Sequence, residues 1–118
     1  MIQPELIPLV AARFKALGEP GRLAILSELQ DGERSVSELA QRTGRGQPNV
    51  SQHLASLSRS GLVASRREGN HILYSLADPY LARLCDAVCE SLVASADAER
   101  KRLAAVARGR AARSRARD

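Results

Sequence analysis

The polar side chains between residues 47 and 53 are of the types that hydrogen-bond to the edges of base pairs. Glutamine and asparagine can bind adenine through two hydrogen bonds, and serine and histidine both donate and accept. Val50, Leu54 and Leu57 recur at helical spacing in the same stretch, which predicts a helix with an apolar inner face. We therefore expect this helix to enter the major groove of duplex DNA with the side chains of Gln47, Asn49, Ser51, Gln52 and His53.

A second group of polar residues surrounds a predicted tight turn at residues 68–70. Gly69 and Asn70 both accept positive φ, as a tight hairpin requires. Such a hairpin can lie as a wing against the minor groove or the phosphate backbone. Its candidate contacts are Arg66, Arg67, Asn70 and His71, and Arg45, in the turn before the polar helix, is a candidate phosphate contact.

The other chemistry in this sequence is that of two thiols, Cys85 and Cys89. Residues four apart on a helix lie on one face, roughly 6 Å from each other. In a dimer built on this helix, two copies could gather up to four thiolates. Such a site would suit As(III), Sb(III) or a soft divalent ion such as cadmium, lead or mercury.

The same two cysteines have other interpretations. Both lie on an apolar stripe with Leu81, Leu84 and Val88, and a free cysteine packs as a small hydrophobic residue. An intersubunit disulfide could also act as a redox switch. The sequence therefore leaves three roles open for the pair: metal or metalloid ligands, redox thiols, or core packing.

The elements that must position these side chains follow one another as four helices, a hairpin and a last helix. Ser35 and Glu38 have the spacing of a capping box, and Asp78 is the expected N-cap of the last helix. The fold class is mainly α with a two-stranded β-hairpin wing, a winged helix-turn-helix. The expected helices span 4–17, 20–30, 35–43, 47–60 and 78–108, and the expected strands span 62–67 and 71–76.

The composition of the 118 residues, 44% of them hydrophobic, suits a small folded domain. No segment has the length of apolar chain needed to span a membrane, and the first residues do not resemble a signal peptide. We therefore expect a cytoplasmic protein. No enzyme is expected, because His53 and His71 have no partner in a triad-like pattern and no phosphate-cradling glycine loop is present.

The net charge of +5 is unevenly distributed along the chain. Eight basic and two acidic residues give residues 99–118 a charge of +6, which leaves −1 for residues 1–98. We expect residues 1–98 to form the DNA-binding and dimerisation domain, so its affinity for DNA must come from local placement of basic groups. Residues 99–118 are expected to form a basic Ala/Arg-rich helix end and a frayed tail, either merely solvated or attracting phosphates non-specifically.

Three segments of the chain together resemble the ArsR/SmtB family of winged-helix metalloregulatory repressors. They are LGEPGRLAIL at 17–26, SVSELAQRTGRGQPNVSQHLASLSRSGLV at 35–63 and RREGNHILYSL at 66–76. The resemblance implies a homodimer formed by the first and last helices. It also implies binding to an imperfect inverted-repeat operator, and release from that operator when an inducer binds.

The sequence departs from the family at its known metal sites. Serines 35 and 37 stand where many members have cysteines on the third helix, and serine is a poor ligand for soft ions. Asp78 matches the first ligand of another family site, but Tyr80 stands where the next ligand, a histidine, is found. The resemblance thus leaves Cys85 and Cys89 as the candidate inducer site. The alternatives are a redox-responsive or concentration-controlled repressor, or a protein-interaction module that does not read DNA.

Overall fold

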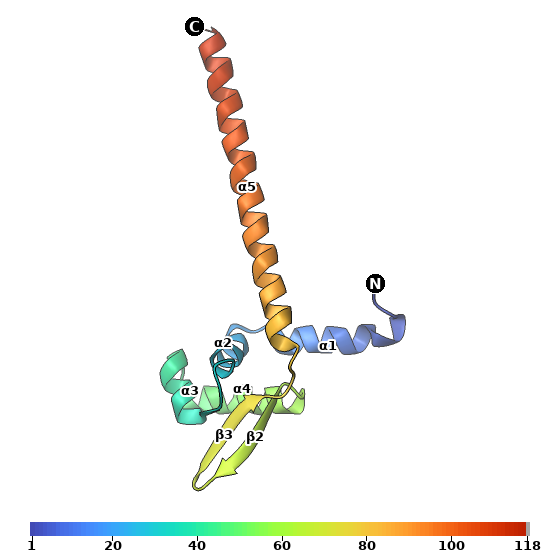
Figure 1. Ribbon diagram of the computed structural model, residues 1–118, viewed down its shortest axis with the longest axis vertical. Helices are drawn as coiled ribbons and strands as arrows, with labels where there is room; N and C mark the ends of the chain where they lie inside the picture. The colour runs from blue at the N-terminus through green and yellow to red at the C-terminus, as the bar shows by residue number, and fades with distance from the viewer. Residues whose placement is uncertain (118) are drawn as a thin grey trace. The chain divides into compact units, whose positions relative to one another are not determined.

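The computed structural model describes residues 1–117 and divides after Pro79 into two compact units. The first unit holds every element except the last helix, and the second is that helix. This order of helices and strands confirms the predicted winged helix-turn-helix, mainly α with a small sheet. The elements are η1 (Pro4–Leu6), α1 (Ile7–Leu17), α2 (Pro20–Leu29), β1 (Arg34–Ser35), α3 (Val36–Thr43), α4 (Gln47–Arg59), β2 (Val63–Glu68), β3 (His71–Leu76) and α5 (Leu81–Arg117) (Figure 1).

The core of the first unit lies where α2, α3 and α4 meet. The predicted inner stripe of α4, Val50, Leu54 and Leu57, is fully buried at 0% exposure. Ile25 of α2 and Leu39 of α3 are equally inaccessible to solvent. Each such side chain contributes about 1.5–3 kcal/mol when it leaves water, so this small cluster supplies much of the stability of the unit.

Local signals in the sequence set the boundaries of α3. The Ser35 hydroxyl accepts a hydrogen bond from the Glu38 N–H at 3.2 Å, and the Glu38 carboxylate accepts one from the Ser35 N–H at 3.1 Å. These two bonds form the predicted capping box and satisfy amides that the first turn leaves unpaired. The helix ends at Gly44, whose φ of 71° lies in the left-handed region that glycine tolerates best.

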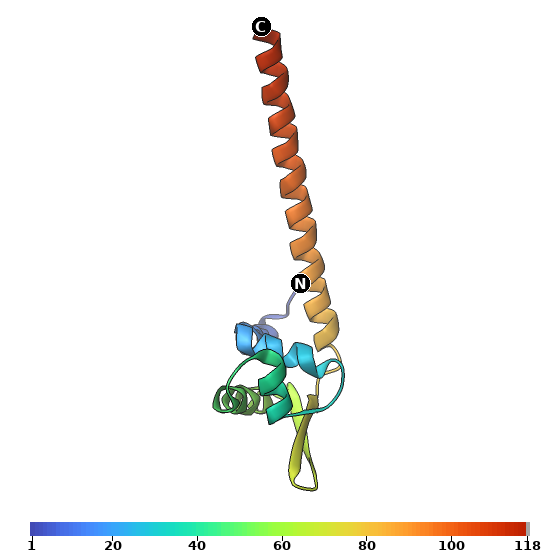
Figure 2. The same cartoon turned by 90° about the vertical axis from the view of Figure 1, so that its left-hand side faces the viewer.

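The sheet has three strands instead of the predicted two. The hairpin of β2 and β3 pairs Val63 with Leu76 at its base and Glu68 with His71 beside its tip, as expected. Strand β1 adds to the other edge of β3, which gives the order β1-β3-β2. The predicted hairpin is present, but the sequence analysis missed β1 because a strand of only two residues has no alternating pattern to detect. The hairpin, residues 63–76, is called the wing below, and it extends away from the helices of the first unit (Figure 2).

The last helix starts later and runs further than predicted. Asp78 was expected to cap it, but α5 begins only at Leu81, and the Asp78 carboxylate accepts a hydrogen bond from Arg13 at 2.6 Å instead. The helix continues to Arg117, because alanine and arginine are strong helix formers. The domain boundary expected after residue 98 therefore lies inside an unbroken helix. Within residues 1–117, no helix is long and apolar enough to cross a membrane.

The capping box makes a testable contribution to stability. Replacing Ser35 by alanine removes the acceptor for the Glu38 N–H, and we expect the free energy of unfolding to fall by about 0.5–2 kcal/mol. Denaturant unfolding at a fixed protein concentration measures this change. Ser58→Ala, at an exposed position of α4, is the matched control and should stay within about 0.5 kcal/mol of the wild type. Equal effects of the two substitutions would contradict the role of the cap.

Candidate nucleic-acid interface

Helix α4 separates apolar and polar side chains along its length. Its buried stripe faces the core, whereas four of its five predicted contacts, Gln47, Asn49, Ser51 and Gln52, are exposed. Gly46 precedes the helix without a side-chain cap, so the first amides of α4 are not satisfied by a capping side chain. Helix N-termini favour anions through such amides and the helix dipole, and this end of α4 thus suits a phosphate next to exposed amide side chains.

The turn between α3 and α4 carries Arg45, which is half-buried. Its guanidinium lies over the start of α2: a Cβ atom added to Gly21 would be 2.9 Å from Arg45 Nη1. The predicted phosphate contact therefore lies close to the start of α2, an element from another part of the chain.

His53 was predicted to face outward with its neighbours, but its side chain is only 16% exposed. Its Nε2 lies 3.3 Å from the Glu19 carboxylate, at the N-terminus of α2. Glu19 also accepts a hydrogen bond from the Arg22 N–H at 2.9 Å. The backbone N–H groups of Arg22 and Gly21 are the main reason that the pKa of Glu19 lies below its usual value, and His53 and Arg22 lower it further. His53 thus has a partner inside the protein.

Arg66, on the wing, is also engaged within the protein. Its guanidinium donates two hydrogen bonds to Glu33, at 2.7 and 2.9 Å, and one to Glu68 at 2.9 Å. These carboxylates raise the pKa of Arg66 above its ordinary value, and the hydrogen bond from Arg66 lowers the pKa of Glu33. Sequence reasoning missed Glu33, because only the pairing of the following strand β1 with β3 brings it beside the wing.

The remaining wing residues of the predicted set lie around the tip of the hairpin. Arg67 lies next to Arg66 in β2, so alternation along the strand directs the two side chains to opposite faces of the sheet. Arg67, Asn70 and His71 are all exposed. The turn between the strands uses Gly69 with a φ of 61°, a left-handed conformation that suits a tight hairpin.

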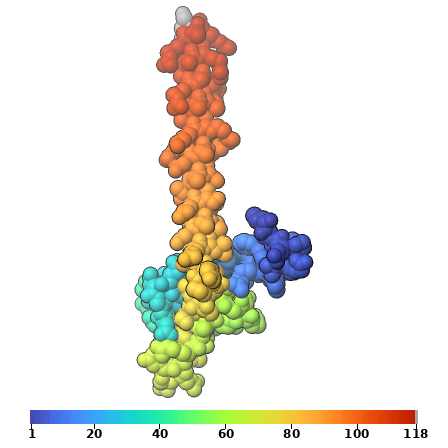
Figure 3. All heavy atoms as spheres, turned by 45° about the vertical axis from the view of Figure 1, so that its right-hand side comes forward, coloured from blue at the N-terminus to red at the C-terminus, as the bar shows by residue number. Residues whose placement is uncertain are grey.

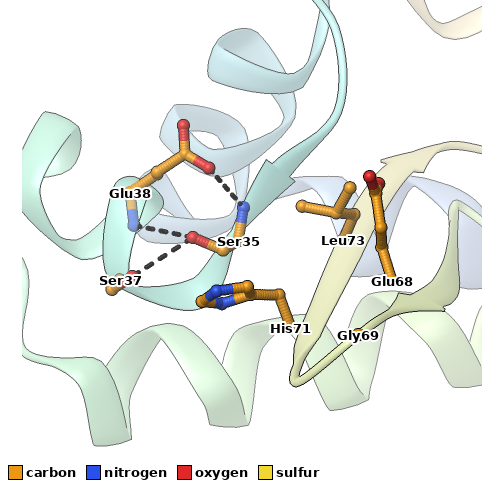
Figure 4. A pocket seen from close by; sticks show the side chains of 7 residues that line it. All are labelled: Ser35, Ser37, Glu38, Glu68, Gly69, His71 and Leu73. Atoms are coloured by element: carbon orange, nitrogen blue, oxygen red, sulfur yellow. Dashed lines mark hydrogen bonds between the residues drawn. The ribbon is translucent and has the colours of Figure 1, made fainter.

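A hollow of about 600 Å³ lies between the start of α3 and the wing (Figure 4). Three of its polar residues are engaged with one another: the hydroxyls of Ser35 and Ser37 are 3.2 Å apart, and the capping box occupies Ser35 and Glu38. Hydroxyls in a capping box cannot replace thiolates, so these residues do not fit a soft ion. The lining residues are Ser35, Ser37, Glu38, Glu68, Gly69, His71 and Leu73.

The two cysteines lie one helical turn apart on α5. Cys85 is half-buried and Cys89 is exposed. Burial raises the pKa of the Cys85 thiol, and the neighbouring Cys89 and Asp86 raise it further. Across residues 1–117, no three histidine, cysteine or acidic side chains are grouped so that they could hold a metal ion. An ion that takes three or more ligands, such as As(III), would therefore need at least one further ligand besides Cys85 and Cys89.

Comparisons with known proteins converge on one class of regulators. The pattern of the family described as "Bacterial regulatory protein, arsR family" matches residues 19–65. The crystal structure of Rv0081 from Mycobacterium tuberculosis is similar with a TM-score of 0.69 and 41% identity, over 84% of this chain and 98% of that chain.

Two further relatives extend the comparison. One is a homodimeric winged helix-turn-helix DNA-binding domain, fragment 1–100 of Mb0332 from Mycobacterium bovis, described as a possible ArsR-family transcriptional regulator. It has a TM-score of 0.66 and 40% identity, over 77% of this chain and 82% of that chain. The other, described as a "Probable mercury resistance operon repressor" of Streptomyces lividans, is 42% identical over 71 residues, which are 60% of this chain and 57% of that protein.

Proposed function

The chain belongs to the ArsR family of bacterial regulatory proteins, and on that basis we propose how it recognises its operator and what releases it. Members of this family are DNA-binding transcriptional regulators, and this chain is a transcriptional repressor and not an enzyme. What remains to be assigned is the set of residues that read DNA, the form of the operator and the inducer.

We propose that α4 reads the major groove with Gln47, Asn49, Ser51 and Gln52. The observation that carries this proposal is the exposure of these four side chains on a helix whose stripe of Val50, Leu54 and Leu57 is fully buried. Asparagine and glutamine in this position can form paired hydrogen bonds with adenine. Phosphates on either side are contacted from the turn before α4 and from the wing, by Arg45, Arg67, Asn70 and His71.

We further propose that the repressor acts as a homodimer on an inverted repeat, with an interface made by α1 and α5. Both helices leave large apolar side chains in solvent when each is considered by itself: in α1, Leu9 is 66% exposed and Phe14 52%, and in α5, Leu92 is 65% exposed. The N-terminal segment projects from the rest of the first unit (Figure 3). Contiguous exposed apolar surface usually marks an interface, and the relative from Mycobacterium bovis is homodimeric.

The reading helix can be tested by truncating its amide side chains. We expect Gln52→Ala and Asn49→Ala each to weaken binding to the operator by about 1–3 kcal/mol, because a base contact is lost. Binding to scrambled duplex of equal length should hardly change. Titrations of labelled DNA upstream of the gene, followed by fluorescence anisotropy at fixed salt, measure both affinities.

Gln30→Ala supplies the matched control, since Gln30 is an exposed glutamine at the end of α2, and it should leave both affinities unchanged. Equal losses of Gln52→Ala on operator and scrambled DNA would show that Gln52 only contacts phosphate. A wild-type protein without any preference for its operator would overturn the whole proposal.

For the inducer we propose a thiol-reactive metalloid or soft metal ion held by Cys85 and Cys89. Thiolates are the preferred ligands of arsenite, antimonite, cadmium, lead and mercury, and two thiols one turn apart can hold one such ion. The missing ligand would come from the second copy in the dimer or from solvent. Because the pKa of the Cys85 thiol is raised, the ion must displace a proton from it on binding.

A Cys85→Ser/Cys89→Ser double variant tests this site. With the wild type bound to operator DNA, added As(III) or Cd(II) should release the complex at near-stoichiometric amounts, whereas the double variant should stay bound. The serine substitutions keep size and shape, so operator affinity without added ion serves as the control for folding. An identical response of both proteins would eliminate thiol sensing. Release of the wild type by an oxidant alone would indicate a disulfide switch instead.

The basic end of α5 is proposed to add sequence-independent attraction to DNA. Deleting residues 109–118 should lower affinity for every duplex and make binding less dependent on salt, since each lost phosphate contact reduces the slope of log K against log salt by about 0.9. The full-length chain with Arg110, Arg113, Arg115 and Arg117 changed to lysine is the control, because it keeps the charge. An unchanged slope after deletion would mark this segment as inert toward DNA.

A further inference from the structure

We infer that His53 is a positioning residue that fixes α4 to the N-terminus of α2 through Glu19 and Gly21, and that operator specificity depends on this attachment. The inference rests on the proposed function, since α4 must read DNA for its position to matter. It assigns His53 a role other than the base contact that the sequence suggested.

A single carboxylate joins the two helices. Glu19 Oε2 accepts the Arg22 N–H at 2.9 Å, which caps the start of α2, and the same oxygen lies 3.3 Å from His53 Nε2 on α4. His53 lies in sequence between exposed Gln52 and fully buried Leu54, at the border between the two faces of the helix. With 16% of its side chain exposed, it is oriented by the protein before any DNA is present.

The contact between Glu19 and His53, called the junction below, lies against Gly21, which has no side chain to occupy the space. A Cβ atom at residue 21 would lie 2.7 Å from His53 Nε2, 2.9 Å from Arg45 Nη1 and 2.9 Å from Glu19 Oε2. Real Cβ atoms do not approach other atoms this closely, because such separations are well inside van der Waals contact. Three polar side chains, one from the start of α2, one from the turn and one from α4, thus converge on Gly21, and a side chain at this position would have to displace their ends.

The contact between His53 and Glu19 restricts the rotation of α4, which apolar packing alone does not. Burial of Val50, Leu54 and Leu57 holds α4 against the core, but the hydrophobic effect has no direction and tolerates small rotations. Hydrogen bonds weaken steeply with misalignment, so paired contacts to a base require a defined rotation of the helix. The His53–Glu19 contact constrains α4 about two turns inside the helix, and the Arg45 guanidinium lies close to Gly21 just before the helix begins.

The test compares His53→Gln, Glu19→Gln and the double variant on the operator, on a set of duplexes with single base-pair changes, and on scrambled DNA. Both substitutions keep polar groups of similar size, and thermal unfolding confirms that the variants fold. We expect each single variant to lose roughly tenfold in the ratio of operator to scrambled affinity, spread over several base pairs, and the double variant to lose no more than the larger single loss.

The controls separate positioning from contact and from charge. Glu5→Gln also removes one negative charge, at an exposed position of η1, and should leave the specificity ratio unchanged. Gly21→Ala should lower the ratio as the His53 variants do, because its added methyl group displaces the junction. In the His71→Gln background, the imidazole signals of His53 in an NMR spectrum should shift on Glu19→Gln but not on Glu5→Gln.

Two results would overturn the inference. One is a loss in His53→Gln confined to a single base pair together with an unchanged ratio in Glu19→Gln, since this is the behaviour of a direct base contact. The other is a wild-type specificity ratio in Gly21→Ala. These outcomes are distinct from failure of the proposed function, in which the wild-type protein itself would bind operator and scrambled duplex equally.

Discussion

The burial of one face of α4 is the constraint on which the proposed DNA-reading surface depends. Val50, Leu54 and Leu57 are inaccessible to solvent, and Ile25 and Leu39 complete the contact from α2 and α3. Side chains project from a helix at 3.6 residues per turn, so a helix that buries this stripe leaves Asn49 and Gln52 outside it, where they are exposed. The same interaction therefore stabilises the first unit and presents the polar groups that can reach a base.

The positions of the basic and imidazole side chains also affect how the first unit can attract DNA. Residues 1–98 carry a net charge of only −1, so the attraction of this part to DNA depends on where each basic group lies. The structure divides the basic and imidazole side chains into two groups. Arg66 and His53 pair with Glu33 and Glu19, although 53% of the Arg66 side chain stays exposed, whereas Arg67 forms no ion pair with the described residues. Such a division keeps the reading surface rigid without burying an unpaired charge.

The apolar side chains that remain exposed bear on how the protein associates with a second copy. A small domain buries a limited share of its apolar side chains, and α1 leaves Leu9 and Phe14 more than half exposed. The long helix α5 does the same with Leu92, and it also carries the two thiols. Association through these helices would join dimer formation to the proposed inducer site, because an ion bound at the interface could favour one arrangement of the two copies over another.

Local patterns in the sequence were sufficient for most of the fold. The helical spacing of the α4 stripe, the Ser35–Glu38 capping box and the Gly69–Asn70 turn each act over a few residues, so they can be recognised without the tertiary structure. The exposed amides of α4 follow from the same spacing. The family resemblance extended these patterns to a function, which the comparisons bear out for transcriptional repression.

Only the tertiary structure decided which polar groups face solvent and which face each other. Glu19 and His53 are 34 positions apart and Glu33 and Arg66 are 33 apart, so no periodic pattern connects them. The two-residue strand β1 forms because it pairs with the edge of β3. Asp78, the expected helix cap, instead accepts a hydrogen bond from Arg13, 65 positions away. Sequence alone determined the elements and their faces because helices and turns form from local interactions. The partners of individual charged side chains depend on contacts between distant segments, and those exist only once the chain is packed.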